Sequence, residues 1–134
     1  MKEFRWPIRV YYEDTDAAGV VYHSNYLKYM ERARTEWLRT LGFSQDELRR
    51  KKEIIIVISE LNMKFVTPAK LDDMLEVRST LQKVTGASFT VDQEIVNAQI
   101  KICAARAKGV CLNALTFKPQ RLPAELKSEL AYDT

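Results

Sequence analysis

Few features of this sequence would place the protein in a membrane or in an oxidising compartment. Its two cysteines, Cys103 and Cys111, form no C-x-x-C pair, so both are predicted to be buried thiols rather than part of a disulfide or zinc site. The longest apolar run, 54–58, is far shorter than the ~20 residues of a membrane-spanning helix. The first seven residues lack the apolar stretch of a secretory signal. We therefore expect a cytoplasmic protein without a transmembrane segment, and peripheral membrane association stays open.

The sequence also has little excess of either charge. The chain has 21 lysines and arginines against 18 aspartates and glutamates, which gives a formal net charge of +3. Basic and acidic residues are interleaved, as in E-R-A-R-T-E from Glu31 to Glu36, which favours a solvated surface over one that binds a polyanion. No nucleic-acid-binding motif is apparent, so we expect no nucleic-acid partner. A nucleic-acid-binding domain stays an alternative on net charge alone, and a salt-dependent gel shift would test it.

What the sequence does contain is enough apolar material for one core. Hydrophobic residues make up 46% of the 134 positions and charged residues 29%, which is a globular composition. The chain has no internal repeat and no low-complexity tract, so we expect a single domain over residues 1–134. A chain of this length buries only about two thirds of its unfolded surface, which makes it a natural candidate for oligomerisation.

The spacing of apolar residues predicts one strand and then one long helix near the start of the chain. Apolar and polar side chains alternate over residues 4–14, as in a strand with one buried face, and Pro7 favours a place at a sheet edge or at the start of the pairing. The period changes to three and four over residues 25–41, which predicts an amphipathic helix followed by Gly42 as its left-handed cap. A shorter capped helix is expected over residues 44–52.

The second half of the chain is predicted to consist of strands joined by turns. The expected strands cover residues 54–67, 74–84, 89–96 and 102–117, and a final helical turn or two is expected at 124–130. One helix followed by hairpin-connected strands is typical of an α+β fold with an antiparallel sheet. We expect the concave face of that sheet to wrap the long helix, although other helix-on-sheet folds share this pattern.

An acidic turn separates the first strand from the long helix. The segment E-D-T-D holds three acids within four residues. A calcium loop of the EF-hand type beginning at Asp14 fails at its fifth and twelfth positions, which are Ala18 and Asn25. The D-x-D spacing of Asp14 and Asp16 is also found in aspartyl phosphatases. Those enzymes need a parallel sheet that this order of elements does not supply. A purely structural turn before the helix stays open.

Four motifs along the chain together resemble one known family. They are Y-x-D-x-D-A-A-G-V-V-Y-H-x-x-Y at 12–26, E-R-A-R at 31–34, P-A-x-L-D-D at 68–73 and K-P-x-x-L-P at 118–123. As a set they are similar to the 4-hydroxybenzoyl-CoA thioesterase family of hotdog proteins, and most to the acyl-CoA thioesterases associated with the Tol–Pal envelope system of Gram-negative bacteria. The resemblance implies the hotdog fold, a homodimer or homotetramer, and hydrolysis of acyl thioesters of coenzyme A or acyl carrier protein. No metal ion and no cofactor are expected.

The resemblance gives Asp16 the central role. Its carboxylate would attack the thioester carbonyl or activate the attacking water, and both roles stay open. A thioester is an activated acyl group, so a carboxylate can suffice, and no G-x-S-x-G motif is present. Unpaired N–H groups at the start of the long helix would stabilise the oxyanion. Gly19 would let the backbone turn tightly and the thioester approach closely.

The resemblance also points to further site residues whose roles the sequence leaves open. His23, the only histidine, is expected either to contribute its imidazole ring or to supply only its backbone. Tyr12 is expected to share a strand face with Asp14 and to hydrogen-bond at the site, or to be a core tyrosine without function. Lys118 and Arg121 are expected to meet the phosphates of coenzyme A, with ordinary surface solvation as the alternative.

One segment departs from close relatives, and one alternative function remains. Cations occupy the last strand at R-A-K, 106–108, so phosphate contacts and subunit packing are not carried over for that strand. A catalytically weak hotdog protein that binds acyl carrier protein, or that scaffolds an envelope-associated complex at the inner membrane, is the alternative. The presence of Asp16 argues against it, and an acyl-CoA hydrolysis assay separates the two.

Overall fold

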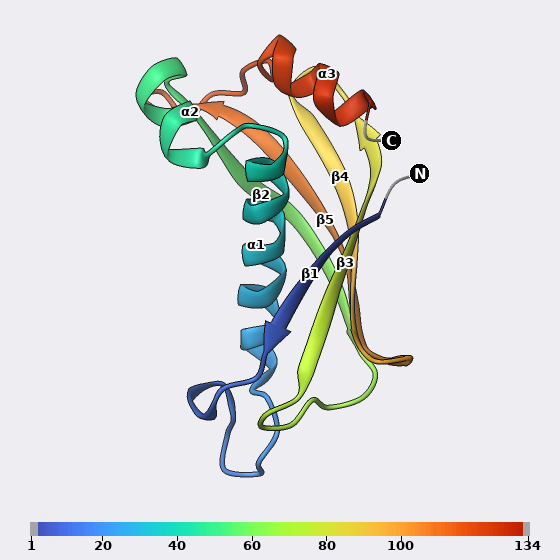
Figure 1. Ribbon diagram of the computed structural model, residues 1–134. Helices are drawn as coiled ribbons and strands as arrows, with labels where there is room; N and C mark the ends of the chain where they lie inside the picture. The colour runs from blue at the N-terminus through green and yellow to red at the C-terminus, as the bar shows by residue number, and fades with distance from the viewer. Residues whose placement is uncertain (1–2, 133–134) are drawn as a thin grey trace.

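The computed structural model describes residues 3–132 and shows one long helix wrapped by a five-stranded antiparallel sheet (Figure 1). The strand order is β1-β3-β4-β5-β2, so β1 and β2 are the two edges. This is the α+β arrangement that the sequence predicts. The strands are β1 (Glu3–Arg9), β2 (Ile54–Phe65), β3 (Met74–Val84), β4 (Ser88–Asn97) and β5 (Ile100–Asn113), and the helices are α1 (His23–Thr40), α2 (Gln45–Lys52) and α3 (Ala124–Tyr132).

The core lies between α1 and the concave face of the sheet. The three- and four-residue spacing on α1 buries one face of the helix, as predicted, and strand alternation supplies the facing side chains. The buried residues of α1 are Tyr26, Tyr29, Met30, Ala33, Trp37 and Leu38. One hydrogen-bond network crosses this core. The Gln93 side chain donates to the Met30 carbonyl and to the Ser79 hydroxyl, and accepts from Arg34. Because its polar atoms are satisfied, this buried glutamine fixes the position of the helix against the sheet.

Local chemistry explains where several elements end. Gly42 has φ +92° just after α1 and serves as the left-handed cap that the sequence predicts. Pro7 lies in edge strand β1, as expected. The last strand ends at Asn113 rather than at residue 117, because the Asn113 carboxamide accepts hydrogen bonds from two following backbone N–H groups and turns the chain.

The prediction of a first strand reaching Asp14 is wrong. β1 ends at Arg9, and Tyr12–Asp14 form a single 3-10 turn. The Asp14 carboxylate accepts from the Tyr11 N–H at 2.9 Å, so a side chain replaces the neighbouring strand as the hydrogen-bond partner. The long helix also begins earlier than predicted, at His23.

The two edges of the sheet differ in how they meet solvent. β1 is short, whereas β2 presents a free edge along 12 residues. Near the middle of β2, Ile58 and Leu61 are each about 40% exposed and lie beside Leu27 of α1 in one shallow groove. An exposed apolar strand edge of this length is a template for pairing with another chain.

Candidate active site

The loop between β1 and α1 is organised around Asp14. The Asp14 carbonyl accepts from the Tyr22 N–H and from the Asn25 side-chain amide, both at 2.9 Å. Together with the bond from Tyr11 to its carboxylate, these contacts tie both ends of the loop to one residue. Asp14 therefore holds the two ends of the loop together through its carboxylate and its carbonyl.

Asp16 lies at the start of a tight turn inside this loop. Its backbone N–H donates to the Val20 carbonyl, and its carbonyl accepts from Gly19, whose φ of +80° favours glycine. One carboxylate oxygen, Oδ1, accepts from the Ala18 N–H at 2.8 Å. Within residues 3–132 no group hydrogen-bonds the other oxygen, Oδ2, and the side chain is exposed. The carboxylate is thus held at one oxygen and presents the other to solvent.

A second turn, 66–73, packs against the loop and fixes its position. The Val21 N–H donates to the Ala69 carbonyl at 2.9 Å, and Val20 pairs with Lys70 as an isolated bridge. The Ala69 N–H in turn donates to the buried Tyr26 hydroxyl at 3.0 Å. The turn formed by the P-A-x-L-D-D motif therefore supports the loop through backbone hydrogen bonds and is not a separate surface turn.

The N-terminus of α1 begins beside this loop at His23. No side chain caps the helix and its first turn contains no acidic residue, so the positive end of the helix dipole lies next to the loop. The His23 side chain is exposed, and its ring lies 4.4 Å from the Tyr22 ring and 6.1 Å from the Phe65 ring. The structure therefore brings Asp16, Gly19 and His23 into one region.

Tyr12 lies at this end of the molecule but is not oriented by a strand. It is 82% exposed and sits in the 3-10 turn, so the predicted shared strand face with Asp14 is wrong. Its backbone carbonyl accepts from Thr15, which is a turn contact. Tyr12 is therefore not a core tyrosine, and a role at the site would depend on a ligand or another chain meeting its ring.

Lys118 and Arg121 are not brought near Asp16 within one chain. Both are exposed and follow β5, at the end of the sheet where Asn113 pairs with Ile54. Figure 1 shows this end beside α2, with the β1–α1 loop at the other end of α1. The helix alone spans about 27 Å, because it has 18 residues at 1.5 Å each. One chain therefore does not let these cations and Asp16 hold the same small group.

Two buried tyrosines lie behind the loop, and the sequence analysis gave neither a role. Burial raises the pKa of Tyr29, and the nearby Asp14 carboxylate adds to this shift. Its hydroxyl has no hydrogen-bond partner within residues 3–132. Burial also raises the pKa of Tyr26, while its bond from Ala69 opposes the shift. The sequence feature that could have indicated Tyr26 is its position, because it follows His23 by three residues on the same helix face.

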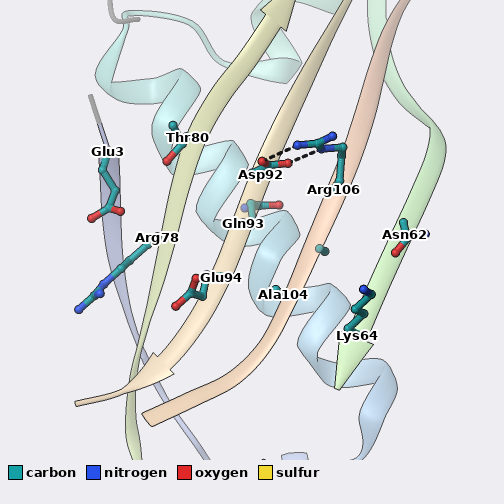
Figure 2. Close-up of a pocket in the computed structure, with 11 residues that line it drawn as sticks. Glu3, Asn62, Lys64, Arg78, Thr80, Asp92, Gln93, Glu94, Ala104 and Arg106 are labelled. Atoms are coloured by element: carbon teal, nitrogen blue, oxygen red, sulfur yellow. Dashed lines mark hydrogen bonds and ion pairs between the residues drawn. The ribbon is translucent and has the colours of Figure 1, made fainter. Parts of the chain in front are cut away.

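A hollow of about 340 Å³ lies on the outer face of the sheet, and its surface differs from that of the Asp16 loop (Figure 2). It lies over Ala104, on the side of the sheet away from α1, among acids and bases from all five strands. Arg106 donates two hydrogen bonds to Asp92 here, at 2.7 and 2.9 Å. Arg106 of the 106–108 segment is therefore paired across neighbouring strands. We place no reaction in this hollow, because its charges are interleaved and it is not part of the Asp16 loop.

The buried cysteines give a direct test of the core. Cys103 and Cys111 are eight positions apart on β5, about 26 Å at 3.3 Å per residue, which is too far for a disulfide. Burial raises the pKa of Cys103 to about 12 and also raises that of Cys111. We expect neither thiol of the folded protein to react with Ellman's reagent at about pH 8, and both to react in guanidinium. A fast reaction of either thiol without denaturant would contradict this burial.

Comparison with known proteins identifies the family to which this fold belongs. Residues 18–104 match the model of the thioesterase superfamily. The chain is 44% identical over 127 residues to the acyl-CoA thioester hydrolase YbgC of Escherichia coli O157:H7, with 94% of each chain covered. A probable thioesterase from Bartonella henselae has a similar crystal structure, with TM-score 0.87, 33% identity, and 90% of this chain and 99% of that one covered. Slr0204, a 1,4-dihydroxy-2-naphthoyl-CoA thioesterase from Synechocystis, gives TM-score 0.90 at 26% identity, with 96% of each covered.

These findings define an α+β hotdog-fold protein of the thioesterase type, as the resemblance implied. More particularly, the chain belongs to the thioesterase superfamily. The expectation of a thioester-cleaving enzyme is confirmed at that level. Association with the Tol–Pal system stays a prediction. Among residues 3–132, no helix is long and apolar enough to cross a membrane.

Proposed function

We propose that this protein hydrolyses acyl-CoA thioesters with Asp16 as the base or nucleophile. The observation that carries the proposal is the placement of a carboxylate with one free oxygen on a loop that leads directly into an uncapped helix N-terminus. The names of relatives such as YbgC, an acyl-CoA thioester hydrolase, support the substrate class. The alternative, a hotdog protein that only binds acyl carrier protein or a complex, leaves this arrangement without a role.

The geometry supports a division of labour between the loop and the helix. The free Oδ2 of Asp16 would attack the thioester carbon, or take a proton from the water that attacks it. The carbonyl oxygen would become an oxyanion, which the first N–H groups of α1 would stabilise. Collapse of the tetrahedral intermediate breaks the C–S bond and releases the thiol of coenzyme A. If Asp16 attacks directly, water then hydrolyses the resulting mixed anhydride and regenerates the carboxylate.

A panel of acyl-CoA thioesters tests this function. Thiol release is measured for straight-chain acyl groups of increasing length and for aromatic acyl groups, with acyl carrier protein thioesters in parallel. We expect catalysed hydrolysis of at least one coenzyme A thioester, and the rank order defines the acyl preference. A folded protein that binds acyl carrier protein but releases no thiol from any substrate would favour the alternative.

The role of the His23 side chain is separable from that of its backbone. We expect His23→Ala to lower kcat more than about tenfold with little loss of stability, because an exposed imidazole beside the loop can hold the carboxylate or polarise the carbonyl. Alanine keeps the backbone N–H, so any oxyanion donor there survives. A kcat within a few-fold of wild type and an unchanged pH–rate profile would leave only the backbone with a role.

The proposed oligomer is a dimer formed through the free edge of β2. A two-fold axis at the middle of this strand would place Ile58 and Leu61 of both copies together and bury them. Antiparallel pairing would set the Ile54 end of one strand against the Phe65 end of the other. Because Asn113 pairs with Ile54, the loop that carries the two cations would then approach the partner's catalytic loop.

This dimer supplies a reason for the positions of Lys118 and Arg121. Within one chain they lie at the end of the sheet opposite Asp16, whereas antiparallel pairing would bring them to the end of the second copy that carries its Asp16 loop. Cations there would meet the phosphates of a coenzyme A whose thioester reaches Asp16 of the other chain. The proposal thus assigns one active site to two chains, with chemistry from one and phosphate contacts from the other.

A further inference from the structure

The turn that follows β5, residues 114–117, holds two large apolar side chains in solvent. Leu115 is exposed, and Phe117 is 66% exposed. The Asn113 side chain accepts from two N–H groups of the turn, and the Asn113 carbonyl accepts from the Phe117 N–H at 2.9 Å. Phe117 has φ of +59°, a conformation that is unfavourable for residues other than glycine. Hydrogen bonds thus fix a strained turn that presents an aromatic ring, which favours a contact role for that ring.

This turn is attached to the start of β2. The Ala114 N–H donates to the carbonyl of Glu53, the residue that precedes the strand, at 2.7 Å. At the other end of β2, Phe65 and Val66 are both more than half exposed, and the Phe65 ring lies 6.1 Å from the His23 ring. The 12 residues of β2, at about 3.3 Å per step, put these two apolar ends about 36 Å apart in one chain.

The two-fold pairing proposed above would bring the two apolar ends together. With Ile58 facing Leu61 of the partner subunit, antiparallel register sets Glu53 against the partner's Val66. Because Ala114 is bonded to Glu53, the 114–117 turn would then lie at the end of the partner's β2 that is next to the start of α1. One symmetry operation would therefore cover the exposed apolar side chains at the middle and at both ends of β2.

The position of Phe117 in the chain indicates which part of a ligand it would meet. Phe117 directly precedes Lys118, which is proposed above to bind the phosphates of coenzyme A. In the dimer these phosphates would lie on one side of Phe117, and the thioester at Asp16 of the partner subunit on the other. The pantetheine arm of coenzyme A joins the phosphates to the thioester sulfur. An aromatic ring at this point offers an apolar face to that arm and excludes water from it.

We propose, resting on the function and the dimer proposed above, that Phe117 is a substrate-binding residue of the partner's active site, where its ring packs against the pantetheine arm of acyl-CoA. The arm would lie between this ring and the partner's Phe65, so two chains bind it together. Loss of the ring weakens the binding of substrate and leaves the chemistry at Asp16 unchanged.

Phe117→Gly and a truncated substrate test this contact. Glycine removes the ring and suits φ of +59°, so the variant should be at least as thermally stable as the wild type and should sediment like it. We expect KM for an acyl-CoA to rise about tenfold while kcat changes less than about threefold. The N-acetylcysteamine thioester of the same acyl group lacks the phosphates and most of the arm, so its kcat/KM should not change. Phe117→Tyr restores an aromatic face and should recover most of the affinity.

Cross-linking between chains tests the placement of the turn without any activity. A variant with Leu115→Cys and Val66→Cys is treated with a short bismaleimide, to which the buried Cys103 and Cys111 do not react. We expect covalent dimers on a denaturing gel, because the two positions lie at opposite ends of β2 in one chain and meet only across the two-fold axis. Met74→Cys in place of Val66→Cys is the control, since Met74 is exposed on β3, which β4 and β5 separate from β2. Absence of covalent dimers from the first variant would overturn the placement.

The outcomes separate this proposal from the function on which it rests. An unchanged KM in Phe117→Gly, or equal losses with acyl-CoA and the truncated thioester, would overturn the role of Phe117 while Asp16-dependent hydrolysis stands. A wild-type protein that hydrolyses acyl-CoA no faster than Asp16→Asn would instead remove the proposed function, and the role of Phe117 with it.

Discussion

Replacement of Asp16 by asparagine is expected to lower kcat for acyl-CoA hydrolysis by about two to four orders of magnitude, the scale of a lost acid–base group. Asparagine removes the negative charge and the nucleophilic oxygen but keeps an oxygen that can accept from the Ala18 N–H. The turn should therefore keep its shape, and thermal unfolding should be close to that of the wild type. Steady-state thiol release at saturating substrate measures the effect.

Glu13→Gln is the matched control for Asp16→Asn. Glu13 is an exposed acid in the same loop, so its replacement changes the local charge by the same amount. We expect Glu13→Gln to keep nearly all of the wild-type kcat, which would show that position rather than net charge matters. More than about a tenth of the wild-type kcat in a folded Asp16→Asn would show that Asp16 is neither base nor nucleophile.

The parts of the fold that the sequence predicts well are those set by one strong local pattern. The buried face of α1 follows from apolar spacing that continues through Trp37, and the cap follows from Gly42. Pro7 was correctly placed at an edge because a residue without an N–H is poorly tolerated between two strands. In each case one physical constraint acts within a few residues of the chain.

The loop that carries Asp16 was harder to predict because side chains compete there with the backbone pattern. Apolar and polar residues alternate as far as Tyr12, but the Asp14 carboxylate binds the Tyr11 N–H and ends the extended conformation. Periodicity does not include such bonds. The separation of Lys118 from Asp16 could not be predicted from the sequence either. It depends on the end of the sheet at which β5 ends and on how many chains form the site.

Disruption of the β2 edge is the second change from which a large effect is expected. Ile58→Glu would place a charge at the proposed two-fold axis, next to its own copy, where burial of an unpaired carboxylate is strongly unfavourable. We expect sedimentation at micromolar concentration to change from dimer or larger to monomer. Acyl-CoA hydrolysis should fall about a hundredfold or more, because each site would lose the partner's cations and the ordered edge.

Ile100→Glu provides the control for Ile58→Glu, since Ile100 is an isoleucine with 56% exposure at the β4–β5 turn, away from the β2 edge. It should remain oligomeric and active. A wild-type protein that sediments only as a monomer while showing full activity would rule out the proposed dimer. A monomeric Ile58→Glu with full activity would show that the site is complete within one chain.

Mixed dimers test whether the two halves of the site come from different chains. One chain carries Asp16→Asn and the other carries Lys118→Ala with Arg121→Ala, so that each kind of homodimer lacks one component in both sites. A mixed dimer contains one site in which intact Asp16 faces intact cations, and random pairing should recover about a quarter of the wild-type sites. Recovery of activity on co-expression would therefore arise only if the catalytic loop and the phosphate contacts meet across the interface. Activity no greater than the sum of the two homodimers would place Lys118 and Arg121 outside the active site.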